Sequence, residues 1–445
     1  MTRGSLTSVR VIVTTGVLTY AAICAWAARD LWFFWDEISY LRAQHIPRYE
    51  LQGFLGNWLP GGRVVFRGLQ TVFGNSYGGY VATNALLAGL CALLLVRLLA
   101  DTARVRAATV AVVVALLTST STLSNVLFAS ETGRWMSFAV VFATLVLLRR
   151  PSIAWPTHAL LGAGSVVMAG LLWLSSAIPG ALLMVVFTPA EWPTRQRHIH
   201  RASALAAALG ISIVGRSIAS HYTPTQEPKL IGEVATATTL LADAPQILVH
   251  SAAAWWVHVA TPLVPGAWLS NSWTRFAFET LVAIGWPTLG IAVVLITVVT
   301  RRARPPRGVA LAGGALAVLC VGIVARGWDW LGTGPELKYG NATNPLAIAW
   351  WWWIWSILRR RTSNVATWAT RVLGGLAICV VLVNVIFLPR SLKALTGQDW
   401  HMGSADQKRA LRECTATNRK PLVVYPFYAH DSGEELCDLY LELED

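Results

Sequence analysis

Charged residues are scarce in this chain: Asp, Glu, Lys and Arg make up 13% of its 445 residues, whereas hydrophobic residues make up 55%. Soluble globular domains are usually about 25% charged and about 45–50% apolar. A chain of this length with so few charges cannot cover a globule with a water-compatible surface, so the composition excludes a soluble enzyme. The same figures exclude a disordered chain, a coiled coil and a small secreted module held by disulfides. Most of the chain is therefore expected to lie in lipid.

Several sequence motifs that carry chemistry are also missing. The chain has no GxxxxGK[ST] loop and no GxGxxG after a strand-like run, which argues against ATP or a dinucleotide as a direct substrate and disfavours a primary pump. It has no C-x-x-C, HExxH or clustered Cys/His pattern, so no zinc site built by the protein is implied. The first hydrophobic run is long and lacks a small-residue cleavage site, so we interpret it as a retained helix.

The positive charge of the chain is distributed in a way that is typical of membrane proteins. The net charge is +13, from 36 basic and 23 acidic residues, and only five of the basic residues are lysine. The basic residues fall in short clusters between apolar runs, as in the cytoplasmic loops of polytopic membrane proteins. A nucleic-acid-binding groove would instead need them on one continuous face. The clusters lie at 97–106, 149–150, 195–201, 301–307 and 359–361.

Eleven apolar runs are candidates for crossing the membrane, since the hydrocarbon core requires about 20 apolar residues in a helix. They are roughly 9–28, 78–100, 107–125, 135–148, 158–175, 177–189, 202–219, 277–299, 308–325, 345–358 and 366–388. Arg3 and Arg10 place the N-terminus in the cytoplasm, and alternation from there puts all five basic clusters inside. We therefore expect an all-α polytopic protein of the plasma (inner) membrane with about 11 transmembrane helices and its C-terminus outside.

This topology divides the chain into two parts. Residues 1–390 are expected to form the transmembrane module, and its outer loops would lie at about 29–77, 220–276 and 326–344. Residues 391–445 would form a small extracytoplasmic region, too short for an independent domain, that packs on the outer loops. Cys414 and Cys437 both lie in this region, where an oxidising compartment makes a disulfide between them plausible.

The apolar stretch 246–275 leaves two interpretations open. We favour an interfacial or re-entrant helix on the outer face, with its tryptophans at headgroup depth. The alternative is a twelfth span, which would invert everything downstream and put the basic cluster at 301–307 outside.

An acidic pair follows the first helix, at the start of an outer loop of about 50 residues, which is longer than a connector needs. Asp36 and Glu37 are adjacent carboxylates at a membrane boundary, where mutual repulsion raises proton affinity or attracts a cation. The alternative is an acidic pair in water that merely ends a helix.

The rest of this loop carries the elements of a known pattern. A Pro-containing segment with His45 leads to Asn57-Trp-Leu-Pro60, then to Arg63 and Arg67, and ends at Phe73-Gly74 before the second span. With the acidic pair, this resembles the first extracytoplasmic loop of the GT-C glycosyltransferases, the superfamily of protein mannosyltransferases, aminoarabinose transferases and mycobacterial arabinosyltransferases. Members carry an acidic pair just after the first helix and tend to have an "N/H-x-x-P … FG" stretch before the second.

A later segment is similar to a second element of that superfamily. Residues 334–345 (GPELKYGNATNP) are similar to the "GRYxxxxxP" segment that many such enzymes place before a late helix. Lys338-Tyr339 stands where those enzymes have Arg-Tyr. Lysine keeps a charge for a phosphate but loses the bidentate fork of arginine. The alternative is a lysine that snorkels to the interface.

Two further polar groups lie in outer loops. Glu131 and Arg134 are three residues apart between the third and fourth spans, where they would either bind substrate or simply pair with each other. Asp329, between Trp328 and Trp330, would either bind a sugar ring or anchor the helix at the interface.

The resemblance implies an inverting transfer of a sugar from a polyprenyl-monophosphate carrier to an acceptor hydroxyl on the extracytoplasmic face. Asp36 would be the general base, and Glu37 would tune it or help hold a divalent cation (Mg or Mn). The donor phosphate would be bound by residues from Arg134, Lys338, Tyr339, Arg63 and Arg67, and the sugar or acceptor by residues from Glu131, His45 and Asp329. The expected partners are the lipid bilayer, the polyprenyl-phosphate sugar and a glycan, lipid or protein acceptor, with no nucleic acid.

Two other classes of protein remain open. A lipid-linked glycan polymerase or ligase also needs an outer site rich in arginine, but its donor is a diphosphate. A polytopic lipid or solute transporter should carry ionisable groups within its spans and an internal repeat. Here the span interiors are nearly free of acids and no repeat is evident.

Overall fold

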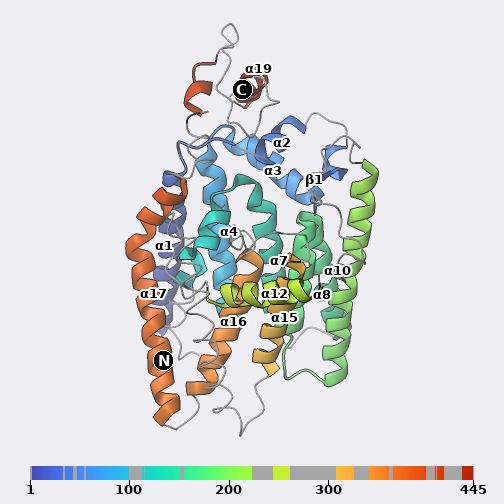
Figure 1. The fold of residues 1–445 in the computed structure, drawn as a ribbon, viewed down its shortest axis with the longest axis vertical. Coiled ribbons are helices and arrows are strands. Elements are labelled where there is room, and N and C mark those ends of the chain that lie inside the picture. Colours follow the sequence, from blue (N-terminus) through green and yellow to red (C-terminus); the bar gives the residue numbers. More distant parts are fainter. Residues whose placement is uncertain are drawn as a thin grey trace.

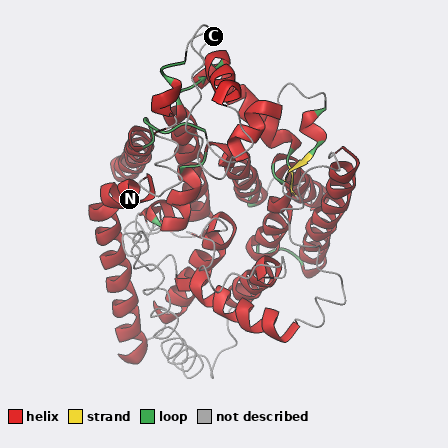
Figure 2. Ribbon diagram, turned by 45° about the horizontal axis from the view of Figure 1, so that its top comes forward, coloured by secondary structure: helices red, strands yellow, loops and turns green. Residues whose placement is uncertain are grey.

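The computed structural model of the chain is built almost entirely from helices. It describes residues 3–33, 36–43, 48–54, 57–99, 113–114, 116–150, 155–222, 244–260, 307–324, 340–359, 364–396, 406, 408–414 and 433–443. Within these ranges the strands are β1 (Gly53–Phe54) and β2 (Asn57–Trp58), which pair antiparallel in a short hairpin (Figure 2, yellow). The all-α expectation therefore holds apart from this hairpin in the first outer loop.

The long helices run side by side along the longest axis of the molecule (Figure 1). They are α1 (Arg3–Ala27), α4 (Tyr77–Leu99), α7 (Thr132–Leu148), α8 (Trp155–Leu172), α9 (Ala177–Phe187), α10 (Thr194–Tyr222), α15 (Arg307–Val324), α16 (Gly340–Arg359) and α17 (Asn364–Thr396). Each coincides with an apolar run of the sequence. The run at 107–125 is described only from 113 onward and ends in α6 (Thr120–Val126), and the run at 277–299 lies outside the described residues.

The lengths and composition of these helices fit a membrane environment. Four described helices are long and apolar enough to cross a bilayer: Tyr77–Leu99, Ala129–Leu148, Thr194–Tyr222 and Arg307–Val324. Shorter apolar helices lie at Val13–Ala27, Pro156–Leu172 and Leu174–Phe187. Large hydrophobic side chains are exposed on α10 and α17, where lipid rather than water would accommodate them. The chain thus has the character of a membrane protein, and its eleven spans and their sidedness stay predictions.

The first outer loop and the C-terminal region gather at one end of the molecule. This loop contains α2 (Asp36–Ala43), the hairpin and α3 (Pro60–Phe73), and it lies with α19 (Gly433–Glu442) at the top of Figure 1. The N-terminus lies toward the opposite end. This arrangement is the one expected if the N-terminus is cytoplasmic and the loop faces outward.

Helix α12 (Ala244–Ala260) covers the described part of the ambiguous stretch 246–275, and it lies across the long helices rather than along them (Figure 1). Its Trp255 indole Nε1 donates to the carbonyl of Gly313 in α15 (3.0 Å), and the Trp351 Nε1 of α16 donates to the Val259 carbonyl (2.8 Å). The crosswise direction agrees with a helix that does not span. Its position differs from the expected one, because packing on α15 and α16 holds it near the middle of the bundle.

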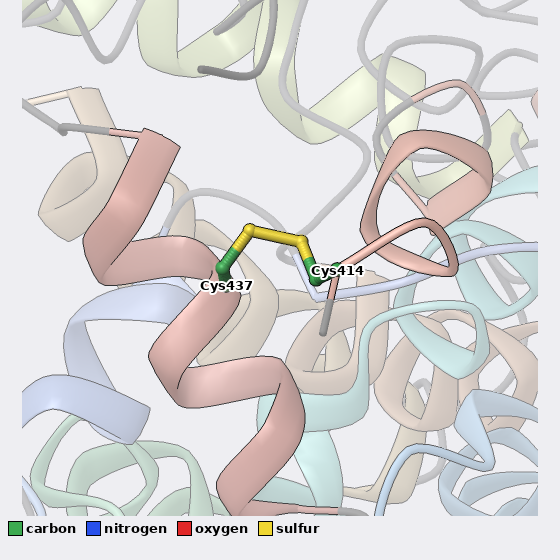
Figure 3. The surroundings of a disulfide bond; sticks show 2 residues. All are labelled: Cys414 and Cys437. Atoms are coloured by element: carbon green, nitrogen blue, oxygen red, sulfur yellow. A yellow bond between two sulfur atoms is a disulfide. The ribbon is translucent and has the colours of Figure 1, made fainter. Parts of the chain in front are cut away.

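The C-terminal region docks on the end of the bundle and is joined internally by a disulfide. Cys414 and Cys437 are bonded across a sequence separation of 23 residues (Figure 3). The Lys408 ammonium donates to the Arg29 carbonyl at the end of α1 (2.8 Å). Burial and the nearby charge of Arg412 lower the pKa of Lys408. The described part of the region around Lys408 therefore packs on the start of the first outer loop.

A tight turn between α3 and α4 receives α19. Asn75 donates from Nδ2 to the Tyr440 carbonyl (2.8 Å), and the Tyr440 ring lies 6.3 Å from that of Trp32. Gly74 adopts φ +46°, and a Cβ added there would lie 2.5 Å from the Leu443 carbonyl oxygen. Only glycine fits such a backbone angle and such a close approach without strain.

Candidate functional site

The centre of the candidate site is the buried carboxylate of Glu37, which is fully shielded from solvent. The Tyr77 hydroxyl lies 3.2 and 3.1 Å from its two oxygens, and the backbone N–H of Ser130 donates to Oε1 (3.0 Å). A buried carboxylate is stable only when donors such as these replace its water. Glu37 therefore ties the first outer loop to the start of α4 and to the short 3-10 helix η2 (Ala129–Glu131).

The Tyr77 hydroxyl contacts both Glu37 and the segment around η2. It lies 2.9 Å from the Leu127 carbonyl and accepts from the backbone N–H of Ala129 (3.3 Å). Because a phenol has a single hydrogen, it donates to Glu37 or to Leu127 at any moment and accepts from Ala129 throughout. Three segments that are distant in the sequence thus meet at one oxygen atom.

The aromatic run before the acidic pair explains why the loop turns inward here. Phe33 makes edge-on contacts with Phe66, Tyr77 and Tyr80, with ring centroids 5.9, 5.5 and 5.1 Å away. Trp32 is also buried, and its Nε1 donates to Asn75 Oδ1 (3.1 Å). Edge-to-face packing of this kind adds to the free energy of burying the rings. The segment that follows α1 therefore packs on α3 and α4, and this packing places Glu37 next to Tyr77.

Asp36, the expected general base, begins α2 and directly precedes Glu37. Its side chain lies outside the described part of the structure. The bonds made by Glu37 nevertheless hold the backbone of this first turn of α2 beside η2.

The other acid–base pair of the outer loops is formed in the structure. Arg134 Nη1 lies 2.9 Å from Glu131 Oε2, and both side chains are only 11% exposed. The Arg134 guanidinium also lies over the Trp173 ring, 4.6 Å from its centroid. Glu131 directly follows Ser130 in the chain, so the ion pair is next in sequence to the backbone amide that binds Glu37. Pairing of the two residues with each other, one of the two interpretations of their spacing, is thus realised.

Small residues allow the outer loop to press against this pair. A Cβ added to Gly62 would lie 2.5 Å from the Leu172 carbonyl oxygen, and one added to Gly133 would lie 2.8 Å from the Gly62 Cα. The starts of α3 and α7 and the end of α8 therefore meet backbone to backbone, next to Arg134.

The two arginines of the outer loop have other partners. Arg63 is buried, donates from Nη1 to the carbonyls of Tyr49 and Gln52 (the latter 2.9 Å away), and lies 3.8 Å over the Tyr49 ring. Arg67 is exposed and lies 3.6 Å from Glu50. Arg63 thus holds the loop together, which differs from the phosphate contact expected for it. These carbonyl partners could not be recognised in the sequence, and a role for Arg63 in binding the donor phosphate stays a prediction.

His45, Asp329, Lys338 and Tyr339 lie outside the described residues. The helix that follows Lys338-Tyr339, α16, reaches the bundle just behind the site: Asn344 Nδ2 donates to the Ser119 hydroxyl (3.1 Å). A small, mostly apolar pocket lies between its first turns and α4, α6 and α7. Its lining residues are Cys91, Leu95, Leu116, Thr122, Trp135, Phe138, Phe142, Asn344 and Pro345.

Two polar residues near the site were not anticipated from the sequence. They are Tyr77 and Asn84, both on α4; Asn84 accepts from the Thr132 hydroxyl (2.6 Å) and donates to the Phe128 carbonyl (2.5 Å). In the sequence, the only indication of their role is that each is a polar residue in an apolar helix. Polar residues in such helices tend to be buried and functional.

No three His, Cys, Asp or Glu side chains group closely enough to bind a metal ion in the ranges that the structure describes. The cation site expected from Asp36 and Glu37 stays a prediction. Searches against protein-family models, curated proteins and solved structures find no match to this chain.

Proposed function

We propose that this chain is a membrane glycosyltransferase of the GT-C type, which moves a sugar from a polyprenyl-monophosphate carrier to an acceptor hydroxyl on the extracytoplasmic face. The observation that carries the proposal is the hydrogen bond from the Ser130 amide to Glu37. It joins the acidic turn of the first outer loop to the loop that bears Glu131 and Arg134. An acidic group for a hydroxyl proton and a cation for a phosphate thus belong to adjoining segments, as glycosyl transfer requires.

In the proposed reaction the acceptor oxygen attacks the anomeric carbon. The bond between that carbon and the phosphate oxygen breaks, and polyprenyl phosphate leaves with the electron pair. Asp36 takes the proton of the acceptor hydroxyl. A direct displacement of this kind inverts the anomeric centre.

Arg134 is the described cation best placed to stabilise charge on the leaving phosphate. Its ion pair with Glu131 and its contact with Trp173 hold the guanidinium in place, so little reorganisation is needed when the charge grows. The next residue, Trp135, lines the small apolar pocket between α4, α6, α7 and α16. Lys338, with Tyr339, would add a second cation from the segment before α16.

Glu37 has a positioning role in this proposal. Its carboxylate is buried and bonded to Tyr77 and Ser130, so it is not available to an acceptor. By fixing the first turn of α2 it orients the residue before it, Asp36.

The test compares Asp36→Asn with Asp30→Asn. Asp30 is an exposed carboxylate in the same loop that pairs with Arg29 (3.4 Å), so the control removes the same charge outside the site. Purified variants in proteoliposomes would be assayed for transfer from polyprenyl-phosphate-linked mannose and arabinose to a cell-envelope extract. We expect Asp36→Asn to lose about 10²–10⁴-fold in turnover and Asp30→Asn to retain it.

Two results would reject the proposal. Equal turnover of folded Asp36→Asn and Asp30→Asn removes Asp36 from the role of base. Transfer from a diphosphate-linked glycan, with none from monophosphate-linked sugars, assigns the protein to the polymerase and ligase class instead.

A further inference from the structure

A group of arginines lies at the end of the bundle opposite to the candidate site. Arg197 and Arg201 are four residues apart on α10 and so share one face of the helix. The guanidinium of Arg201 is repelled by the charges of Arg197 and of Arg307, the first residue of α15. None of the ion pairs found in the described residues includes these three arginines. Like charges have thus been brought together, with no acid paired to them in the part of the chain that the structure describes.

The arginines also present hydrogen-bond donors that are not satisfied within the described part of the chain. The Nε atoms of Arg197 and Arg201 are both buried and have no acceptor there. Arg197 uses Nη2 to donate to the Thr194 hydroxyl (3.1 Å), which leaves its Nε oriented without a partner. The side chains of Arg197 and Arg201 are half-buried and that of Arg307 is exposed, so their outer guanidinium N–H groups are the donors that a ligand with anionic oxygens would reach. Such a ligand would also offset the repulsion among the three charges.

A rigid aromatic cluster holds this part of α10 in place. The Trp192 ring stacks on His158 (centroids 4.3 Å apart, planes 6° apart) and meets the edge of His200 (5.4 Å). His200 Nδ1 lies 3.2 Å from the His158 carbonyl. Since His200 precedes Arg201 directly, the cluster fixes the backbone from which the arginine projects.

Tryptophans of α16 pack beside the start of α15, and on this basis we place the arginines at the depth of the lipid headgroups. Gly308, next to Arg307, packs so closely on the Trp353 ring that an added Cβ would lie 2.9 Å from it. Further along α16, the Arg359 guanidinium lies 5.3 Å over the Trp355 ring. Tryptophans are enriched at the membrane–water interface. Figure 1 shows the starts of α10 and α15 toward the N-terminal end of the bundle, which the basic clusters assign to the cytoplasm.

From this geometry we propose that Arg197, Arg201 and Arg307 form a binding site for the phosphate group of an anionic phospholipid in the cytoplasmic leaflet. Basic pockets between membrane helices bind such headgroups through charge and through hydrogen bonds to phosphate oxygens. The acyl chains would lie along the exposed apolar face of α10, where Leu205, Leu209 and Ile213 are uncovered. The site is separate from the proposed glycosyl transfer and does not depend on it.

The test measures binding of phosphatidylglycerol, with phosphatidylcholine as the neutral comparison, to the full-length protein in detergent by native mass spectrometry. An arginine that contacts the headgroup directly is taken to contribute about 1 kcal/mol to binding, so Arg201→Gln should weaken phosphatidylglycerol binding about fivefold, and Arg197→Gln combined with it more. Arg195→Gln is the matched control, because Arg195 is an exposed arginine on the same turn of α10. Phosphatidylcholine should bind less and should not respond to any of these changes.

A second arm separates the lipid from a soluble anion. If millimolar inorganic phosphate alone displaces phosphatidylglycerol, and raises the thermal unfolding midpoint as much as the lipid does, the ligand is a soluble phosphate and the lipid assignment is wrong. If Arg201→Gln and Arg195→Gln weaken binding equally, the site is wrong. The unfolding midpoint of each variant without lipid shows that a loss of binding is not a loss of folding.

Discussion

The Tyr77 hydroxyl lies 3.1 Å from the buried Glu37 carboxylate, although the two residues are 40 positions apart in the chain. This contact spans the whole of the first outer loop, since Glu37 begins it and Tyr77 begins the helix that follows it. The loop is thereby closed at its base, and the aromatic contacts of Phe33 lie directly against the closure. The arrangement of the first outer loop at this end of the molecule depends on the contact between Tyr77 and Glu37, which closes the loop.

Removing the Tyr77 hydroxyl should therefore loosen the loop. Tyr77→Phe leaves a buried carboxylate with one donor fewer, which should lower the free energy of unfolding by about 1–3 kcal/mol. Tyr222→Phe is the control, because among the described residues the Tyr222 hydroxyl has no hydrogen-bond partner. Thermal unfolding in detergent checks the difference, and equal midpoints for the two variants would contradict the closure.

The Glu131–Arg134 pair allows structural and functional roles to be separated. Removing one partner strands a largely buried charge and should cost about 3–5 kcal/mol in either Arg134→Gln or Glu131→Gln. The double variant removes both charges and should recover part of that stability. We expect sugar transfer to stay absent in the double variant, because the proposed phosphate ligand is still missing. If the double variant regains both stability and sugar transfer, Arg134 is needed only to balance the charge of Glu131 and does not bind the phosphate.

Docking of the C-terminal helix should be sensitive to a single methyl group at Gly74. Gly74→Ala must take up a positive φ and meets the Leu443 carbonyl oxygen at 2.5 Å, so we expect a loss of about 1–3 kcal/mol. Gly68→Ala in the middle of α3 meets nothing within 4 Å and should gain about 0.5–1 kcal/mol from helix propensity. Limited proteolysis should release the C-terminal segment only from Gly74→Ala, and the same protection in both variants would rule out tight docking at this turn.

The disulfide should also stabilise the C-terminal region. Closing a loop of this length is worth about 3 kcal/mol in the chain-entropy description, so Cys414→Ser should make residues 415–436 easier to cleave. Cys379→Ser, at an exposed free cysteine, is the control. Alkylation and mass analysis without reductant should find four free thiols in the native protein. A count of six would show that the bond does not form.

The sidedness of the bundle can be tested with two exposed positions. In a Cys379→Ser background, Asp30→Cys should react with a membrane-impermeant maleimide added to intact cells. Arg195→Cys should react only after the cells are opened. The physical basis is that the basic clusters stay in the cytoplasm. The reverse pattern would invert the topology and, with it, the proposed face of catalysis.

The helices were predictable because lipid sets their length and polarity. A run such as 78–100 is long enough and apolar enough for only one structure in a bilayer, and the structure has α4 at Tyr77–Leu99. The acidic pair could also be identified in the sequence, because two carboxylates directly after an apolar helix contrast with the hydrophobic residues that precede them. By contrast, the depth of α12 in the bundle was not readable. It is set by the bond from the Trp255 N–H to α15 and by the bond that the Trp351 N–H of α16 donates to the Val259 carbonyl, and no local pattern names these partners.

The sequence by itself therefore determined that this is a bundle of apolar helices and that an acidic pair follows the end of the first of them. Tertiary structure decided what those groups do. Contacts with Tyr77 and Ser130, which lie far away in the sequence, made Glu37 a buried carboxylate. Packing likewise bonded Arg63 to loop carbonyls and brought Arg197 and Arg201 together with no ion pair among the described residues. The physical reason is that hydrophobicity acts residue by residue, whereas a hydrogen bond or an ion pair exists only once two distant segments have met.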